Sequence, residues 1–225
     1  FDVDKDFCYG RLVNFTDLQG KKWFNRELNV VEDFEFTLKK YPNAKEKDFY
    51  FLPSIHKIAI IGRESPSLGQ LQKFFQLALS KVVNQEFDES VEVNIVTDSI
   101  LLDKIYSSSK LVSLEMHVSY SNNDVNEDYE AAIDDELKAQ EVRKMHSTFS
   151  GTSKNPLKIK KKSLIGGILS LTRNNGYAIA KGEFDGEYQT VSTQNYPQSC
   201  KLVTTEKNLK SELKKKMLSF FGRNG

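Results

Sequence analysis

The chain has 225 residues, of which 39% are hydrophobic and 28% charged, and 32 Lys and Arg nearly balance 31 Asp and Glu to a net charge of +1. This length supports one large domain or two small ones with an apolar core. The balance argues against a protein that binds polyanions over its whole surface, but it leaves room for a local basic face. No run approaches the roughly 18 apolar residues that a membrane span needs.

The two cysteines, Cys8 and Cys200, lie far apart in unlike contexts. Two lone thiols fit a reducing compartment better than a disulfide framework does, so we expect a cytoplasmic protein. The chain begins at Phe1 and not at Met, so the sequence leaves open where the natural N-terminus lies and whether a signal peptide preceded it.

Residues 1–41 predict strands. The clearest is the alternation of Phe34, Phe36 and Leu38, because a period of two is typical of a half-buried strand. The segment from Tyr41 to Asp48, with a proline and mixed charge, predicts a loop.

The stretch from Asp48 to Tyr120 has the strongest pattern and predicts strand, helix, strand, short helix and strand. Its apolar runs are FYFL, KIAIIG, VEVNIV and LVSLEMHVSY. Ser67 begins a capping box for a helix that runs to about Gln85, and Thr97–Ser99 offers caps for the shorter helix. Such alternation predicts a sheet with at least partly parallel strands and helices packed on it.

The strand over residues 111–120 predicts one core face and one polar face. Successive side chains of a strand point to opposite faces, so every second residue shares a face. The apolar face holds Val112, Leu114, Met116, Val118 and Tyr120, and the polar face holds Ser113, Glu115, His117 and Ser119.

The segments after this strand predict a helix, a loop, a hairpin and a last helix. An acidic amphipathic helix is expected over residues 129–140, and a mobile Lys-rich loop over 150–162 marks a subdomain boundary. The apolar run SLIGGILSL follows, where Gly166-Gly167 weakens a helix by roughly 1 kcal/mol per glycine. Asp185-Gly186 predicts a type I′ hairpin turn, and a basic helix begins near Thr205.

These elements predict a single domain over residues 1–225 of the α/β (α+β) class. A mixed β-sheet is covered by helices, and a C-terminal β-hairpin and a basic helix are added after the Lys-rich loop.

Two basic segments are the first candidates for function. Lysines bind phosphates without sequence preference, and tyrosines on the hairpin offer stacking surfaces for unpaired bases. The alternative is an ordinary solvated loop and helix face. The candidate nucleic-acid-binding residues are Lys154, Lys158, Lys160, Lys161, Lys162, Lys210, Lys214, Lys215, Lys216, Arg223, Tyr177 and Tyr188.

Glu115 and His117 are the candidates for catalysis, because residues i and i+2 of a strand share a face. The pair suits a general base, two metal ligands or a hydrogen-bonded surface pair. A metal would need further ligands, and no HExxH or paired CxxC spacing supplies them. We therefore expect no metal and no cofactor, and the surface pair is the favoured interpretation.

Two other groups are interpreted as structural. His146 follows Arg143 in RKMH, at a spacing shorter than nucleases with an Arg–His constellation use. The acidic run DDELK, Asp134–Lys138, falls on a helix, where its side chains diverge, and not on the strand that metal-dependent nucleases need.

The order of elements in KLVSLEMHVSYSNNDVN, in the acidic helix and in SLTRNNGYAIAKGEFDG resembles uncharacterised bacterial proteins found in mobile-element and phage-defence neighbourhoods. In these, a strand leads through an Asn/Asp turn into a helix, and an Asn-Gly turn later opens a hairpin. The resemblance covers roughly residues 49–205 and is one of pattern. It implies a setting, defence against phage or mobile DNA, and assigns no catalytic residues.

Three functions follow as hypotheses. The first is a non-catalytic component of a bacterial anti-phage defence system that binds or senses DNA or RNA. The second is an effector nuclease of such a system that uses Glu115 and His117. The third is a scaffold that self-associates or binds a protein partner, through an edge strand or through its acidic and basic helices.

Overall fold

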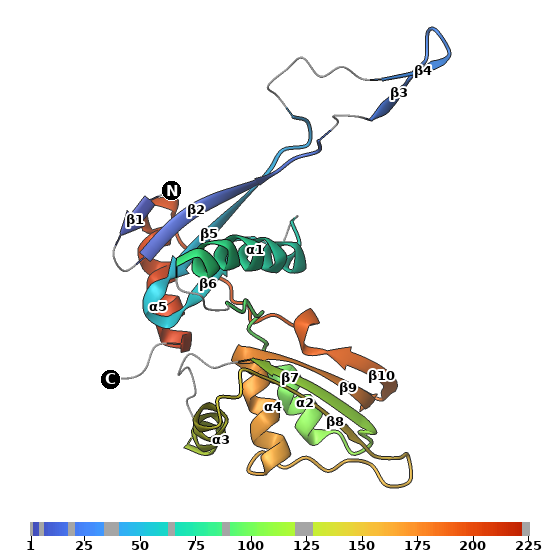
Figure 1. The fold of residues 1–225 in the computed structure, drawn as a ribbon, viewed down its shortest axis with the longest axis vertical. Coiled ribbons are helices and arrows are strands. Elements are labelled where there is room, and N and C mark those ends of the chain that lie inside the picture. The colour runs from blue at the N-terminus through green and yellow to red at the C-terminus, as the bar shows by residue number, and fades with distance from the viewer. Residues whose placement is uncertain are drawn as a thin grey trace. The chain divides into compact units, whose positions relative to one another are not determined.

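The computed structural model describes residues 2–4, 7–17, 21–33, 41–62, 66–86, 91–119 and 128–221 (Figure 1). By its internal contacts the chain divides into two compact units, Phe1–Ser67 and Leu68–Gly225. The division falls between Ser67 and Leu68, and the Lys-rich loop lies inside the second unit. Among the helices of the described ranges, none combines the length and the apolar character that crossing a membrane requires.

The first unit is built on an antiparallel sheet with the strand order β1-β2-β5-β6. Its strands are β1 (Asp2–Asp4), β2 (Phe7–Asn14), β5 (Lys45–Leu52) and β6 (Lys57–Ile60), and a separate hairpin is formed by β3 (Lys22–Asn25) and β4 (Val30–Asp33). Since β5 begins at Lys45, the loop predicted up to Asp48 is wrong in its second half. The strand predicted around Phe34, Phe36 and Leu38 lies outside the described residues.

A charged network joins β2 to β5 in this unit. Arg11 and Asp48 are register partners, and the Arg11 Nε donates to Asp48 Oδ1 at 2.6 Å. The Tyr9 hydroxyl donates to the same oxygen at 3.0 Å. The hydrogen bond from Arg11 lowers the pKa of Asp48, outweighs the opposing effect of burial, and is reinforced by Tyr9.

We expect Asp48→Asn to destabilise the protein at neutral pH by on the order of 1 kcal/mol, since both partners are partly exposed. A carboxylate with a lowered pKa stabilises the fold above its unfolded pKa of about 3.9, and this contribution disappears as the pH falls through the folded pKa. Chemical denaturation at pH 7 and at pH 3 should therefore show a smaller difference between wild type and variant at pH 3 than at pH 7. An equal difference at both values would contradict an ionic origin.

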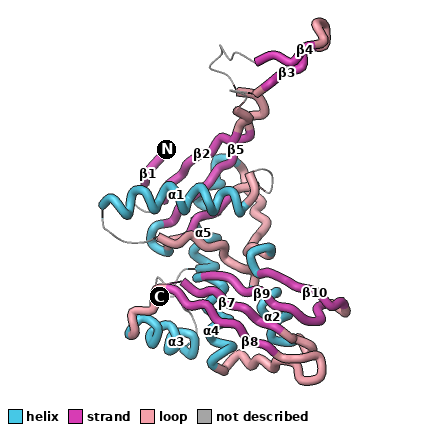
Figure 2. The backbone as a smooth tube through the Cα atoms, turned by 45° about the vertical axis from the view of Figure 1, so that its right-hand side comes forward, coloured by secondary structure: helices cyan, strands magenta, loops and turns pink. Residues whose placement is uncertain are grey.

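The second unit contains a four-stranded sheet with the order β10-β9-β7-β8 (Figure 2). Its strands are β7 (Ser113–Ser119), β8 (Lys144–Ser150), β9 (Gly176–Phe184) and β10 (Glu187–Ser192). Every described strand pairing is antiparallel. The α+β class is thus confirmed, and the expected parallel component is wrong, because the helices that separate these strands return the chain into antiparallel neighbours.

The described part of the second unit contains the helices α1 (Leu68–Glu86), α2 (Ser99–Ser107), α3 (Asp128–Ala139), α4 (Leu164–Asn175) and α5 (Leu209–Phe221). The predicted helices starting near Ser67, Asp98, Tyr129 and Thr205 are confirmed, and Asp98 caps α2 by accepting from the Ile100 N–H at 2.9 Å. The hairpin turn is also confirmed, since Asp185 and Gly186 have φ of 53° and 86°.

The run VEVNIV, residues 91–96, does not form the predicted strand. Side chains of α1 form hydrogen bonds with backbone groups of this segment instead. The Gln72 amide donates to the Val93 carbonyl at 2.7 Å, and the Val93 N–H donates to the Gln76 amide oxygen at 2.7 Å. Because buried backbone groups need partners but not a neighbouring strand, the segment can meet this need without joining a sheet.

The core of the second unit lies between one face of the sheet and the helices α2 and α4. Leu111, Leu114 and Met116 are fully buried there. Burial of each such side chain contributes about 1.5–3 kcal/mol to the stability of the fold. This burial determines which residues of β7 face the core, and therefore also which residues lie on the opposite face of the sheet.

Candidate functional site on the outer face of the second sheet

The strand β7 has one buried and one partly exposed face, as its alternation predicts. Leu114, Met116 and Val118 are buried, and the intervening residues are half-buried. We call the side of the sheet that carries these intervening residues the outer face. The register pairs His117 with His146 of β8 on one side and with Tyr177 of β9 on the other. Paired residues of antiparallel strands share a face, so these three side chains lie together.

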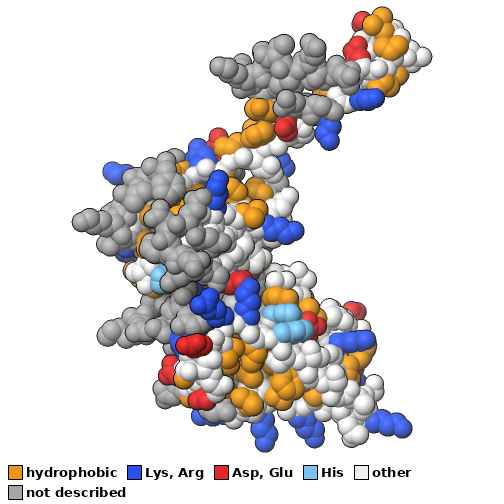
Figure 3. Space-filling view, in the orientation of Figure 1, with side chains coloured by type: hydrophobic (Ala, Val, Ile, Leu, Met, Phe, Trp, Pro, Cys, Tyr) orange, Lys and Arg blue, Asp and Glu red, His pale blue; other side chains and the backbone are white. Residues whose placement is uncertain are grey.

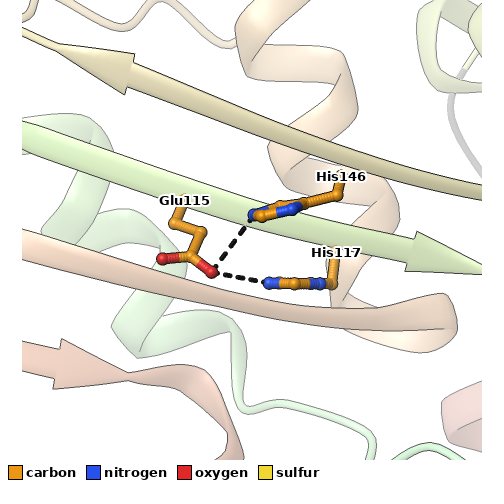
Figure 4. A group of neighbouring side chains, drawn as sticks. All are labelled: Glu115, His117 and His146. Carbon is orange, nitrogen blue, oxygen red and sulfur yellow. Dashed lines mark hydrogen bonds and ion pairs between the residues drawn. The ribbon is translucent and has the colours of Figure 1, made fainter.

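One carboxylate of the outer face is hydrogen-bonded to two imidazoles (Figure 4). Glu115 Oε1 lies 2.7 Å from His117 Nε2 and 3.2 Å from His146 Nε2. The side chains of His117, Glu115 and His146 are 30%, 36% and 55% exposed. The group is therefore accessible to a ligand, and Figure 3 shows the histidines of this unit on its surface.

Three aromatic rings are stacked across three adjacent strands. The His117 and His146 ring centroids are 4.0 Å apart with planes 15° from parallel, and those of His117 and Tyr177 are 4.4 Å apart at 16°. We call His146, His117 and Tyr177 the aromatic ladder. Its order follows from the strand register alone, because β8, β7 and β9 are neighbours in the sheet.

The charge state of Glu115 determines which atoms donate and which accept in its hydrogen bonds with the two histidines. The hydrogen bond from His117 lowers the pKa of Glu115 against a smaller effect of desolvation, and the nearby His117 and His146 lower it further. At neutral pH the side chain is an ionised carboxylate, which can only accept hydrogen bonds. Both Nε2 atoms must then carry a hydrogen, so the Nδ1 atom of a neutral ring is left as an acceptor.

Glu115, His117 and His146 are also a candidate metal-ligand set, since one ligand atom from each lies within 4.8 Å of the others. A metal, however, lies in the plane of each imidazole that binds it, about 2.0–2.1 Å from the nitrogen. Two nearly parallel rings with centroids 4.0 Å apart do not share such a point. In the stacked arrangement the residues do not fit a metal, and at least one ring would have to leave the stack.

His146 is the member of this side-chain group that the sequence interpretation missed. From the sequence His146 is interpreted as structural, whereas residues 144–150 form β8 and bring it to Glu115. The signal was present as an alternation in KMHSTFS, in which Met145, Ser147 and Phe149 are half-buried and the residues between them are exposed. Because few residues of this edge strand are apolar, its period of two is hard to recognise in the sequence.

The predicted stacking residues Tyr177 and Tyr188 share the outer face. Tyr188 pairs with Glu183, which lies on the same side of β9 as Tyr177 because even spacing preserves the face. Lys181, between them, places its Nζ 6.0 Å from the centroid of the Tyr188 ring. The structure therefore places both tyrosines and a lysine on the surface that carries Glu115.

The Lys-rich loop lies on the helical side of the unit. Lys161 Nζ is 2.7 Å from Asp103 Oδ1 of α2 and 5.4 Å from the centroid of the Tyr106 ring. The side chain of Ile159 is buried in the core, which anchors the loop. The exposed side chains of the loop include those of Lys154, Lys158, Lys160 and Lys162.

The candidate lysines of α5 have other neighbours. Lys215 Nζ lies 3.1 Å from Glu212 of its own helix, and Lys216 lies over the Phe220 ring at 5.2 Å. Lys210 and Lys214 are half-buried, and Arg223 lies outside the described residues. The lysines of the Lys-rich loop and the lysines of α5 therefore contact different residues.

The acidic run on α3 has a structural role. Asp134 is buried and its Oδ2 atom lies 2.6 Å from Lys138 Nζ, one helical turn away. An internal ion pair of this kind supports the helix, which agrees with the interpretation from the sequence.

Comparison with known proteins gives a family without an assigned activity. No curated protein and no solved structure matches the chain. Residues 1–219 match the model of a domain of unknown function, DUF4747, and the chain therefore belongs to this family.

Proposed function

We propose that this protein binds single-stranded nucleic acid on the outer face of the second sheet, as the nucleic-acid-binding component of a bacterial anti-phage defence system. The observation that carries the proposal is the aromatic ladder, an accessible row of rings across three strands. Exposed aromatic side chains on a sheet stack with unpaired bases, whereas the bases of a duplex already stack on each other.

The charges of the outer face suit a nucleic-acid strand that is held more by base stacking than by contacts between lysines and phosphates. Among the residues of β7 to β10, the lysines are Lys181, which lies over Tyr188, and Lys144, which forms an ion pair with Glu92. If these two lysines contact phosphates, log affinity should fall with log salt at a slope of about −1.4, since each contact contributes about −0.7 on a single strand. The defence setting is supported by the pattern resemblance over the middle of the chain.

Tyr177→Ala should weaken binding of a single-stranded oligonucleotide by about 5-fold to 150-fold, because stacking on one aromatic ring contributes about 1–3 kcal/mol. Tyr177→Phe keeps the ring and removes only the hydroxyl, so it should bind like the wild type. Fluorescence anisotropy with labelled single- and double-stranded DNA and RNA measures both, at low and near-physiological salt.

The same assay separates the outer face from the Lys-rich loop. If Lys160/Lys161/Lys162→Ala weakens binding and flattens the salt dependence while Tyr177→Ala does not, the loop is the binding surface. No binding of any strand at either salt concentration would refute the proposed function.

A further inference from the structure

We infer that Glu115, His117 and His146 form an acid–base site that cleaves RNA without a metal ion, at a phosphodiester next to a 2′-hydroxyl. The inference rests on the proposed function, because binding on the outer face is what brings a strand to the site. It adds an activity, a substrate class and a catalytic role for His146.

The arrangement provides the two proton-transfer groups that such a reaction needs. Each Nε2–H is directed to Glu115, so each ring is held in one tautomer with its Nδ1 available for proton transfer. The ring centroids of His117 and His146 are 4.0 Å apart, so the two proton-transfer groups lie side by side. A neutral imidazole acts as a base and an imidazolium acts as an acid, so the same side chain can fill either role.

Other charged and titratable groups face this pair from the neighbouring strands. Tyr177 of β9 stacks on His117, and Lys144 of β8 lies on the same face as His146, two residues away. Lys144 forms an ion pair with Glu92 and does not contact the imidazoles in the structure. Glu115 is thus the charged group in direct contact with both rings, and it is a positioning residue that acts through them.

RNA is the substrate class because it carries its own nucleophile. The neutral imidazole takes the proton of the 2′-hydroxyl, and the 2′-oxygen forms a bond to the adjacent phosphorus. The bond from phosphorus to the 5′-oxygen of the next nucleotide breaks, and the imidazolium gives its proton to that oxygen. The products are a 2′,3′-cyclic phosphate and a 5′-hydroxyl, and no water, metal or other reactant enters this step.

The aromatic ladder connects binding to this chemistry. Tyr177 stacks directly on His117, with ring centroids 4.4 Å apart. A base that packs against the ladder therefore brings its own ribose and phosphate beside the imidazoles. The residues for stacking and for proton transfer lie on the same three β-strands. A DNA strand, which lacks the 2′-hydroxyl, would therefore be bound but not cut.

The test is a denaturing gel of a 5′-labelled single-stranded RNA incubated with the full chain in EDTA, beside an all-2′-deoxy strand of the same sequence. We expect cleavage of the RNA alone, with cyclic phosphate ends. His117→Ala and His146→Ala should each reduce the rate by about 100-fold or more, since a proton-transfer group contributes that much. Circular dichroism checks that each variant is folded, and Glu115→Gln provides a near-isosteric third variant.

The matched control is His56→Asn. The chain has three histidines, and His56 is the one outside the second unit. It has a φ of 50°, a left-handed conformation that Asn tolerates well. This variant should cleave RNA at the wild-type rate, which also shows that a contaminating ribonuclease is not the source if the other two variants are inactive.

The outcomes separate this inference from the proposed function. Binding of RNA without cleavage refutes the acid–base site and leaves the binding function intact, whereas absence of binding refutes both. Equal cleavage of the deoxy strand, or cleavage that EDTA abolishes and a divalent metal restores, also overturns the inference. Wild-type cleavage by His117→Ala and His146→Ala would place the activity elsewhere.

Discussion

Glu115→Gln should reduce RNA cleavage by about 100-fold to 10,000-fold while leaving RNA affinity nearly unchanged. The carboxylate accepts from both Nε2 atoms through one oxygen. An amide has one accepting oxygen and a donating NH2 group. The amide oxygen can still accept from both rings, but it carries no charge, so the imidazolium that forms during the reaction loses the stabilisation that the carboxylate gives it.

The pH profile distinguishes this positioning role from a merely structural one. The pKa of Glu115 is lowered below its ordinary value of about 4.3, so the carboxylate keeps its charge from pH 5 to 8. As the pH falls below about 4.3, the wild type should lose activity because Glu115 becomes protonated, and Glu115→Gln should lack this acidic limb. Glu115→Asp retains the charge and should recover part of the rate.

Single-turnover rates from about pH 3 to 8, together with anisotropy on a 2′-deoxy strand, provide the measurement. If Glu115→Gln lost affinity and rate by the same factor, Glu115 would hold the surface together without orienting the imidazoles. If its pH profile matched that of the wild type, the carboxylate would play no part in the proton transfers.

The local part of this site could be predicted from the sequence, and the long-range part could not. Glu115 and His117 are two residues apart, and a period of two places them on one face wherever the strand lies. His146 reaches Glu115 through strand pairing across 31 residues, which no local spacing reveals. The register that joins them follows from the burial of Met116 and its neighbours on the inner face.

The incorrect fold predictions have the same origin. Strand–helix–strand alternation fits parallel and antiparallel neighbours alike, and only tertiary packing decides between them. The run VEVNIV has strong strand propensity, but two glutamines of α1 satisfy its backbone. Propensity describes what a segment can form, and the partner that reaches its hydrogen-bonding groups decides the outcome.

Gly166 shows how a residue that weakens a helix can be required by its packing. Ser163 caps α4 by accepting from the Gly166 N–H at 3.2 Å, and the Tyr106 hydroxyl donates to the Gly166 carbonyl at 2.7 Å. A Cβ at this position would lie 2.7 Å from the carbonyl oxygen of Lys161 and closer still to that of Lys160. The backbone of the Lys-rich loop therefore packs directly on the first turn of the helix.

We expect Gly166→Ala to destabilise the protein by at least about 1–3 kcal/mol, the usual cost of overpacking, because backbone atoms cannot yield as a flexible side chain does. Gly69→Ala is the matched control. Gly69 lies in the first turn of α1 with no atom within 4 Å of an added Cβ, so alanine there should be neutral or should stabilise by up to about 1 kcal/mol. Chemical denaturation of both variants measures the difference. Equal stability of the two would mean that the loop does not pack against α4, and its lysines would then be free to reach a ligand elsewhere.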